Sequence, residues 1–123
     1  MRVLLIDDSK PVRMIARLGL SRLGQVDTLE ASSGEEGLEI ARSAHPDAIL
    51  LDVNMPGLGG RETLTALRAD PSTKDIPVVF LTAEESRSET DSLRRLGALA
   101  VLAKPFDPRT LFAQLQAYLA VAA

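Results

Sequence analysis

A small set of residues in this chain could together carry out phosphoryl chemistry. It combines three carboxylates, Asp7, Asp8 and Asp52, with the cation Lys104 and the hydroxyl of Thr82. Neighbouring carboxylates repel one another unless a positive charge lies between them. A divalent cation such as Mg²⁺ meets that need, because proteins hold it with one or two carboxylates, waters and phosphate oxygens. A lysine and a hydroxyl can bind phosphoryl oxygens, so the set contains the parts for forming an aspartyl-phosphate.

Short aliphatic runs directly precede these residues, and they must bring them together. Apolar runs bounded by turn signals are typical of buried strands. We predict strands over residues 3–6, 26–30, 48–51, 76–81 and 99–103. Helical patterns separate the runs, which favours a parallel sheet with helices on both faces. Parallel strands end on one edge of a sheet, and open α/β folds bind their ligands at that edge.

The first and last helices are marked by apolar stripes and prolines. In the helix over residues 10–23, the stripe that we expect to face the core includes Val12, Ile15, Ala16 and Leu20. The last helix is predicted to start with Asp107 as its N-cap and Pro108 at its first position.

Capping boxes over residues 33–36 and 86–89 predict the starts of two further helices. The helix after residue 86 has only Leu93 and Leu96 as large apolar residues. We therefore expect its packing to be the weakest in the domain.

Composition is that of an ordinary globular domain, with 123 residues, 46% hydrophobic and 25% charged. Aromatic residues make up only 3%, so we expect a core of Leu, Val, Ile and Ala. The absence of cysteine excludes thiol and zinc–thiolate chemistry and fits a cytoplasmic protein. The net charge of −3 argues against direct nucleic-acid binding. No apolar run approaches the roughly 20 residues of a membrane helix, so no membrane association is expected.

Each site residue also has a purely structural explanation when taken alone. Asp7 and Asp8 can cap the following helix, Thr82 can start a turn, and Lys104 can be a solvated lysine. These explanations together require three independent coincidences at one edge of one sheet, so we favour a common site. His45, the single histidine, is expected in a surface loop at the other end of the strand that leads to Asp52.

The ordered set of motifs resembles the receiver domain of two-component response regulators, and chemotaxis receivers in particular. The motifs are Asp7-Asp8, Asp52 followed by Met55-Pro56-Gly57, Thr82-Ala83 and Lys104-Pro105-Phe106. The resemblance implies one receiver domain over residues 1–123 with the flavodoxin-like (βα)5 fold. Its doubly wound parallel sheet would have the strand order 2-1-3-4-5. The chain would then be a phosphoprotein of two-component signal transduction that works in a phosphorelay.

The resemblance also implies a role for each reacting residue. Asp52 would accept the phosphoryl group from a histidine kinase or a histidine phosphotransfer protein. Thr82 and Lys104 would bind phosphoryl oxygens, and the peptide bond between Lys104 and Pro105 would be cis.

The implied cofactor is Mg²⁺, with Mn²⁺ as a substitute. Asp8 and Asp52 would bind the metal, Asp7 would act mostly through water, and Asn54 would contribute its backbone carbonyl. The positions that would tune the lifetime of the phosphoryl group are Asn54, Ala83 and Glu84.

One position departs from the family pattern. Receivers usually carry Tyr or Phe three residues before the lysine, and the ring turns inward on activation, whereas this chain has Val101. Partner binding would still switch through the face of the fourth helix, fifth strand and fifth helix. We expect motion of the loop after Thr82 to carry more of the coupling here.

A second surface feature lies on the first helix. Pro11, Met14 and Leu18 stand roughly opposite the core stripe. Scattered apolar residues on a surface need no special explanation. In this family, however, the phosphodonor docks on this helix, so these residues are candidates for a docking patch.

Two other functions remain as alternatives to a signalling receiver. A Mg²⁺-dependent phosphohydrolase with an aspartyl-phosphate intermediate usually has a second acid two residues after its nucleophile, where this chain has Asn54. A phosphorylation-independent scaffold would have lost site residues, and none is missing. As a receiver, the chain would catalyse only its own phosphorylation and slow self-dephosphorylation. We expect a monomer or weak phosphorylation-dependent dimer with an unknown protein target, either standing alone or as the N-terminal part of a longer protein.

Overall fold

The computed structural model describes residues 1–24, 26–84 and 86–122, in which strands alternate with helices. In chain order the elements are β1 (Arg2–Ile6), α1 (Lys10–Gly24), β2 (Asp27–Ala31), α2 (Gly34–Ala44), β3 (Ala48–Asp52), α3 (Gly60–Ala69), β4 (Val78–Thr82), α4 (Arg87–Arg95), β5 (Ala100–Ala103) and α5 (Leu111–Ala122). Every predicted strand is present, and the largest difference is at β4, which starts at Val78 rather than Ile76.

The strands form one parallel sheet in the order β2-β1-β3-β4-β5. This confirms the flavodoxin-like order that the resemblance implies. β3 and β4 are buried along their whole length, as expected for continuous apolar strands with helices on both faces. Because the strands are parallel, the carboxyl ends of β1, β3, β4 and β5 lie on the same edge.

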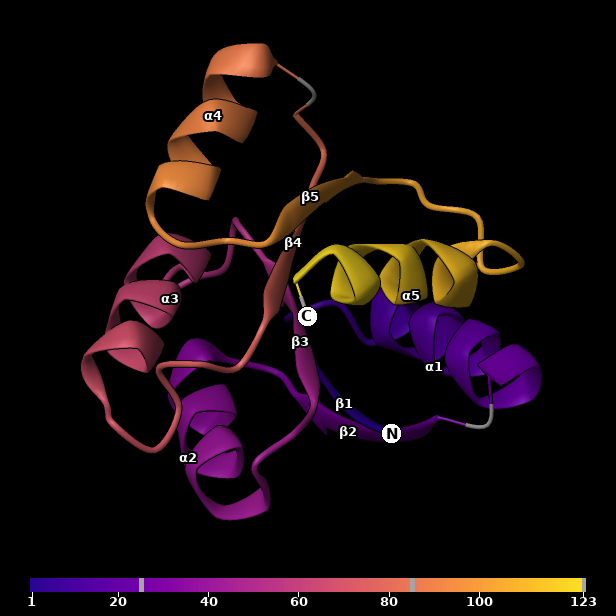
Figure 1. Cartoon of the computed structure of the whole chain (residues 1–123), viewed down its shortest axis with the longest axis horizontal. Coiled ribbons are helices and arrows are strands. Elements are labelled where there is room, and N and C mark those ends of the chain that lie inside the picture. Colours follow the sequence, from indigo (N-terminus) through magenta and orange to yellow (C-terminus); the bar gives the residue numbers. More distant parts are fainter. Residues whose placement is uncertain (25, 85, 123) are drawn as a thin grey trace.

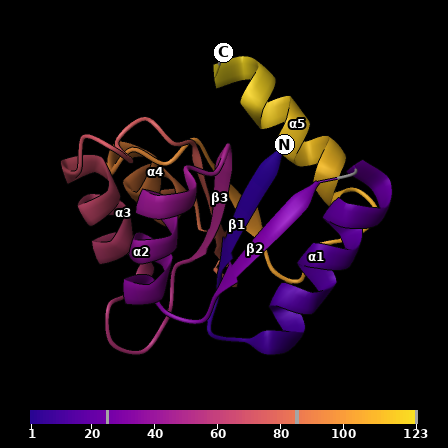
Figure 2. The same cartoon turned by 90° about the horizontal axis from the view of Figure 1, so that it is seen from below.

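The helices form two layers, with α1 and α5 on one face of the sheet and α2, α3 and α4 on the other (Figure 1 and Figure 2). Alternate strand residues serve the two layers. Val3 and Leu5 pack in the core beneath α1 and α5, whereas Leu4 and Ile6 pack in the opposite core.

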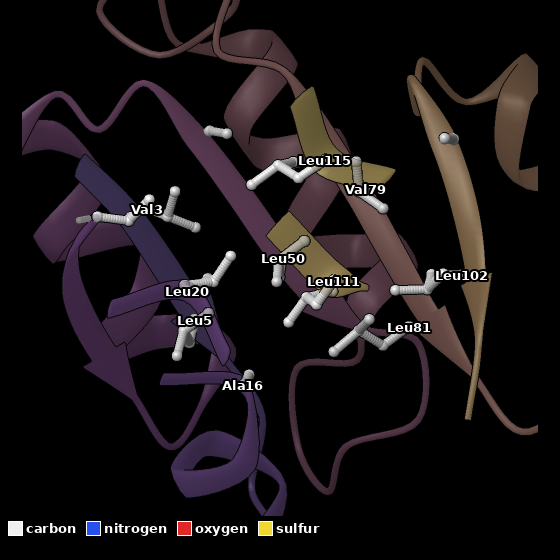
Figure 3. Packing of buried hydrophobic residues seen from close by; sticks show 13 residues of the cluster. Val3, Leu5, Ala16, Leu20, Leu50, Val79, Leu81, Leu102, Leu111 and Leu115 are labelled. Carbon is white, nitrogen blue, oxygen red and sulfur yellow. The ribbon is translucent and has the colours of Figure 1, made fainter. Parts of the chain in front are cut away.

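Aliphatic side chains make up most of both cores, as the composition predicts. Figure 3 shows Leu111 and Leu115 of α5 against Leu50 and Val79 of the central strands. The largest fully buried side chain in the described residues is Phe80 of β4, in the core on the other face.

Two predictions about the helices are wrong in detail, for the core stripe of α1 and for the start of α5. Ile15 is 43% exposed, because Ala16 and Leu20 make the core contacts and Ile15 lies one position around the helix from Ala16. Leu96, the other large apolar residue in this region besides Leu93, is 37% exposed, because α4 ends at Arg95 and the chain turns away. α5 starts at Leu111 rather than at Pro108, because a turn closed by the hydrogen bond from Thr110 N to Asp107 O precedes it.

The two capping boxes form only in part. In each, the serine hydroxyl accepts from the backbone N–H three residues later, from Glu36 to Ser33 and from Glu89 to Ser86. The two glutamate carboxylates have other partners. The Glu36 carboxylate accepts from Ser32 N, and the Glu89 carboxylate pairs with Arg61 of α3. Among the helices described, none has the length and hydropathy to cross a membrane.

Candidate functional site

The carboxyl edge of the sheet carries an acidic cluster formed by Asp7, Asp8 and Asp52. Asp7 and Asp8 follow β1, and Asp52 is the last residue of the neighbouring β3. One carboxylate oxygen from each lies within 4.8 Å of the other two. Asp7 and Asp52 are buried, whereas Asp8 is exposed. The structure therefore brings the three carboxylates together in a site that opens to solvent at Asp8.

Lys104 places a positive charge against this cluster. Its Nζ lies 2.9 Å from Asp7 Oδ2 and 3.1 Å from Asp52 Oδ1. Burial lowers the pKa of the Lys104 ammonium, but the hydrogen bonds and charges of Asp7 and Asp52 outweigh burial and leave this pKa raised. The ammonium is therefore charged at neutral pH. The backbone of Lys104 is held by β4 through its N–H, which donates to Thr82 O at 2.8 Å, and the Lys104–Pro105 peptide bond is cis.

The Lys104 ammonium only partly offsets the cost of a negative charge on the Asp52 carboxylate. Burial, followed by the charge of Asp7, raises the pKa of the Asp52 carboxyl group above its ordinary value. Lys104 and the backbone N–H of Asn54, which lies 3.3 Å from Asp52 Oδ1, act in the opposite direction but do not cancel the shift. A site with such an excess of negative charge favours the binding of a further cation.

The available donors fit a hard divalent cation. The side-chain donors of Asp7, Asp8 and Asp52 are all carboxylate oxygens, which Mg²⁺ and Mn²⁺ prefer over nitrogen or sulfur. The exposed position of Asp8 leaves access for the waters that Mg²⁺ usually keeps. The cluster is thus chemically suited to the predicted metal.

Arg13 is a site neighbour that the sequence did not reveal. Its Nη1 donates to the carbonyl oxygen of Asp7 at 2.6 Å, and its Nε pairs with Glu30 of β2 at 3.0 Å. The side chain of Asp7 is held as well, because Asp7 Oδ1 accepts from Ser9 N at 2.9 Å. Nothing local marks this arginine in the sequence, because Glu30 lies on a strand that only the fold brings close.

Thr82 is buried at the end of β4, and its hydroxyl accepts a hydrogen bond from Glu84 N at 3.0 Å. Ala83 and Glu84 themselves are exposed. Val101 of β5 is partly buried in the core that includes its register partner Phe80. The loop after Thr82 therefore reaches solvent, while the position of the family's aromatic ring holds a small apolar side chain.

A hollow of about 650 Å³ opens between the loop after β3 and the start of α4. Its lining includes Asn54 and Met55 from that loop, together with Arg61, Glu84 and Glu89. Arg61 crosses from α3 to α4, with Nη2 2.8 Å from Glu89 Oε2 and Nη1 2.9 Å from Ser92 Oγ. The role of Arg61 was not predicted from the sequence either, because its partners lie 28 and 31 residues further along the chain.

The two remaining features lie where the sequence placed them. On α1, Pro11 is exposed, and Met14 and Leu18 are 43% and 48% exposed. His45 is exposed at the end of α2, on the side from which β3 starts, so it lies at the opposite end of that strand from Asp52.

This site and this fold define a class of signalling domain, and the chain belongs to the response regulator receiver domain family. The family model with that description matches residues 3–116. The chain is a receiver of the chemotaxis type, consistent with a phosphoaccepting signalling domain rather than a metabolic enzyme.

Individual relatives support the same class. The chain is 35% identical over 120 residues to chemotaxis protein CheY1 of Helicobacter pylori strain J99, covering 97% of both chains. It is 34% identical over 119 residues to protein PilH of Pseudomonas aeruginosa, covering 97% of this chain and 98% of PilH. Among solved structures, the chemotaxis response regulator CheY4 of Vibrio cholerae superposes with a TM-score of 0.88 at 36% identity, covering 95% of this chain and 97% of that one.

Proposed function

We propose that Asp52 accepts a phosphoryl group from a phosphohistidine of a histidine kinase or histidine phosphotransfer protein. One observation carries the proposal, which is that Asp52 lies in contact with Lys104 and within 4.8 Å of two further carboxylates at the carboxyl edge of the sheet. In the reaction an Asp52 carboxylate oxygen bonds to phosphorus while the P–N bond of the donor breaks and its electron pair returns to the imidazole.

The other residues act on the phosphoryl oxygens. Lys104 moves its ammonium from the Asp52 carboxylate to a phosphoryl oxygen while it remains beside Asp7. Thr82 donates its hydroxyl proton to another phosphoryl oxygen, and a hydroxyl can do so while it still accepts from Glu84 N. Mg²⁺, held by Asp7, Asp8, Asp52 and the Asn54 carbonyl, would neutralise the charge on the phosphoryl oxygens. Mn²⁺ would be able to replace Mg²⁺ at this site.

The proposed output is a change in partner binding rather than turnover of a substrate. A phosphoryl group adds about −1.5 to −2 charge units at neutral pH, which would shift the face of α4, β5 and α5. Asn54, Ala83 and Glu84 are proposed to set how long the phosphoryl group lasts. We expect no turnover of small phosphomonoesters. The only hydrolysis expected is the slow loss of the protein's own phosphoryl group.

Residues 1–123 are proposed to act as one cytoplasmic receiver domain, monomeric or weakly dimeric when phosphorylated. The phosphodonor is proposed to dock on Pro11, Met14 and Leu18 beside the site. Met14→Asp and Leu18→Asp should slow transfer from the cognate donor without changing phosphorylation by acetyl phosphate. If both variants accepted the phosphoryl group from the cognate donor at the native rate, these residues would not form the docking patch.

The proposal is tested by intact-mass analysis after incubation with acetyl phosphate and Mg²⁺. The native chain should gain one phosphoryl group, and Asp52→Ala should gain none. Asp91→Ala, which removes an exposed carboxylate of α4, is the matched control and should behave like the native chain. An adduct on Asp52→Ala would overturn the assignment.

A further inference from the structure

α4 is attached to the domain largely through polar side chains. Leu93 is the one residue that it buries among those described. The guanidinium of Arg61 instead holds two of its turns, through Glu89 and Ser92. We call these three residues the α3–α4 latch. The side chains of Arg61 and Glu89 are 36% and 19% exposed, so the ion pair lies near the surface, where it can open.

A continuous chain of hydrogen bonds joins this latch to Thr82. Thr82 Oγ1 accepts from Glu84 N at 3.0 Å, and Glu84 Oε1 accepts from Ser86 Oγ at 3.1 Å. Ser86 Oγ in turn accepts from Glu89 N at 3.2 Å, and the Glu89 carboxylate binds Arg61. The N-cap of α4 is thus connected on one side to the site threonine and on the other to α3.

We propose that this chain of contacts is a relay that couples the phosphoryl state of Asp52 to the position of α4, with Arg61 as a positioning residue for the loop after Thr82. The inference rests on the proposed function. A phosphoryl group would draw the Thr82 hydroxyl toward itself, and its negative charge would repel the Glu84 carboxylate. Both effects displace the loop that carries Ser86, and the latch opens because Glu89 moves with its helix.

The relay also accounts for how a signal could leave this particular site. Val101 has no polar group and only a short side chain, and it is packed among apolar residues. Val101 therefore cannot act as the aromatic switch of the family, in which a ring moves between an exposed and a buried position. The polar path from Thr82 through Ser86 to Arg61 does not involve Val101, so it works without the aromatic residue.

Coupling between two sites is reciprocal, so a variant without the latch must bind a phosphoryl mimic more tightly. We choose Arg61→Met, which keeps the length of the side chain and removes both bonds. The probe is beryllium fluoride with Mg²⁺, titrated against backbone amide chemical shifts. Arg61→Met should bind it about two- to fivefold more tightly, the range expected for loss of a near-surface ion pair. Without the probe, amide shifts over residues 86–95 should already lie partway toward their bound positions.

The matched control is Arg42→Met. Arg42 pairs with Asp70 at 2.8 Å, the same distance as in the latch, and likewise joins two parts of the fold, and within the described residues it forms no hydrogen bond or ion pair with a member of the relay. The Arg42→Met variant should bind beryllium fluoride with the affinity of the native chain. Glu89→Gln, which keeps the shape of its side chain, should resemble Arg61→Met and serves if that variant does not fold.

Unchanged affinity in both Arg61→Met and Glu89→Gln would overturn the relay, as would an equal gain in Arg42→Met. These failures are distinct from failure of the proposed function. If native protein forms no adduct at Asp52, the proposed function falls. If the adduct forms normally while the latch variants bind the probe like native protein, the relay alone is wrong.

Discussion

α3 and α4 lie in the same layer of the molecule but are attached to it in different ways (Figure 1). α3 buries Leu64 and Leu67, and its first residue, Gly60, packs so closely on the Asp52 carbonyl that a side chain would overlap it. α4 buries Leu93 alone among its described residues and is otherwise held by the latch. The helix next to Asp52 is thus anchored in the core, whereas the helix that is proposed to respond is held by contacts that can break.

Truncation of a core side chain in each helix is the strongest test of this contrast. Leu64→Ala in α3 should lower the free energy of unfolding by about 2–5 kcal/mol, because Leu64 is fully buried. Leu93→Ala in α4 should instead increase hydrogen exchange over residues 87–95 while β3 and β4 keep their protection. Urea unfolding and amide exchange measure the two effects. Equal loss of protection across the sheet in both variants would contradict the difference in anchoring.

Removal of Lys104 should have the next largest effect. Lys104→Met leaves Asp7 and Asp52 buried without their cation, at a cost of about 1–3 kcal/mol at neutral pH. The loss should shrink in acid, because the protonated Asp52 carboxyl, whose pKa is raised, no longer needs the cation. In the native chain the raised pKa of Lys104 means that its stabilisation is present at neutral pH and is lost only as pH rises through that pKa. Urea unfolding at several pH values tests this, and a pH-independent loss would argue against the pairing.

Asp52→Asn should stabilise the protein by less than Lys104→Met destabilises it. The pKa of Asp52 is raised in the folded state, so the native chain loses stability as pH rises from the ordinary value of 3.8 through the folded value. The variant avoids that loss, and its advantage should vanish below pH 3.8, where Asp52 is protonated in both states. Mg²⁺ should stabilise the native chain more than the variant. A variant less stable than the native chain at neutral pH would contradict the direction of this shift.

The smallest effects are expected from the two surface ion pairs. Arg61→Met and Arg42→Met should each lower the free energy of unfolding by only about 0.2–1 kcal/mol. Their local effects should differ, since only Arg61→Met should loosen residues 87–95 in hydrogen exchange. Faster exchange of α4 in Arg42→Met would show that its mobility does not depend on the latch.

The fold and the convergence of the site could be predicted because both depend on local signals. Aliphatic runs mark the strands, and a parallel arrangement brings Asp52, Thr82 and Lys104 to one edge wherever they lie in the sequence. The strand order came from family resemblance rather than from periodicity. Errors arose where tertiary packing decides, as for Ile15, whose place on the apolar stripe does not say how far the core reaches around α1.

Arg13 and Arg61 could not be found from the sequence. An arginine on a helix surface is ordinary, and only the fold brings Glu30 to the first and Glu89 to the second. Val101 shows the reverse case, because its departure from the family pattern is visible in the sequence, but the polar contacts that run from Thr82 to Arg61 are not. Side-chain networks between elements are therefore the part of the molecule that required a structure.

The most direct test of the central claim is to locate the phosphoryl group on the chain. After incubation with acetyl phosphate and Mg²⁺, borohydride reduction converts an aspartyl-phosphate to homoserine, which changes the mass of its tryptic peptide. We predict the change in the peptide of residues 43–61, which holds Asp52, and none in the peptide of residues 3–13, which holds Asp7 and Asp8. A change in the second peptide, or in neither, would contradict the assignment of Asp52 as the phosphoacceptor.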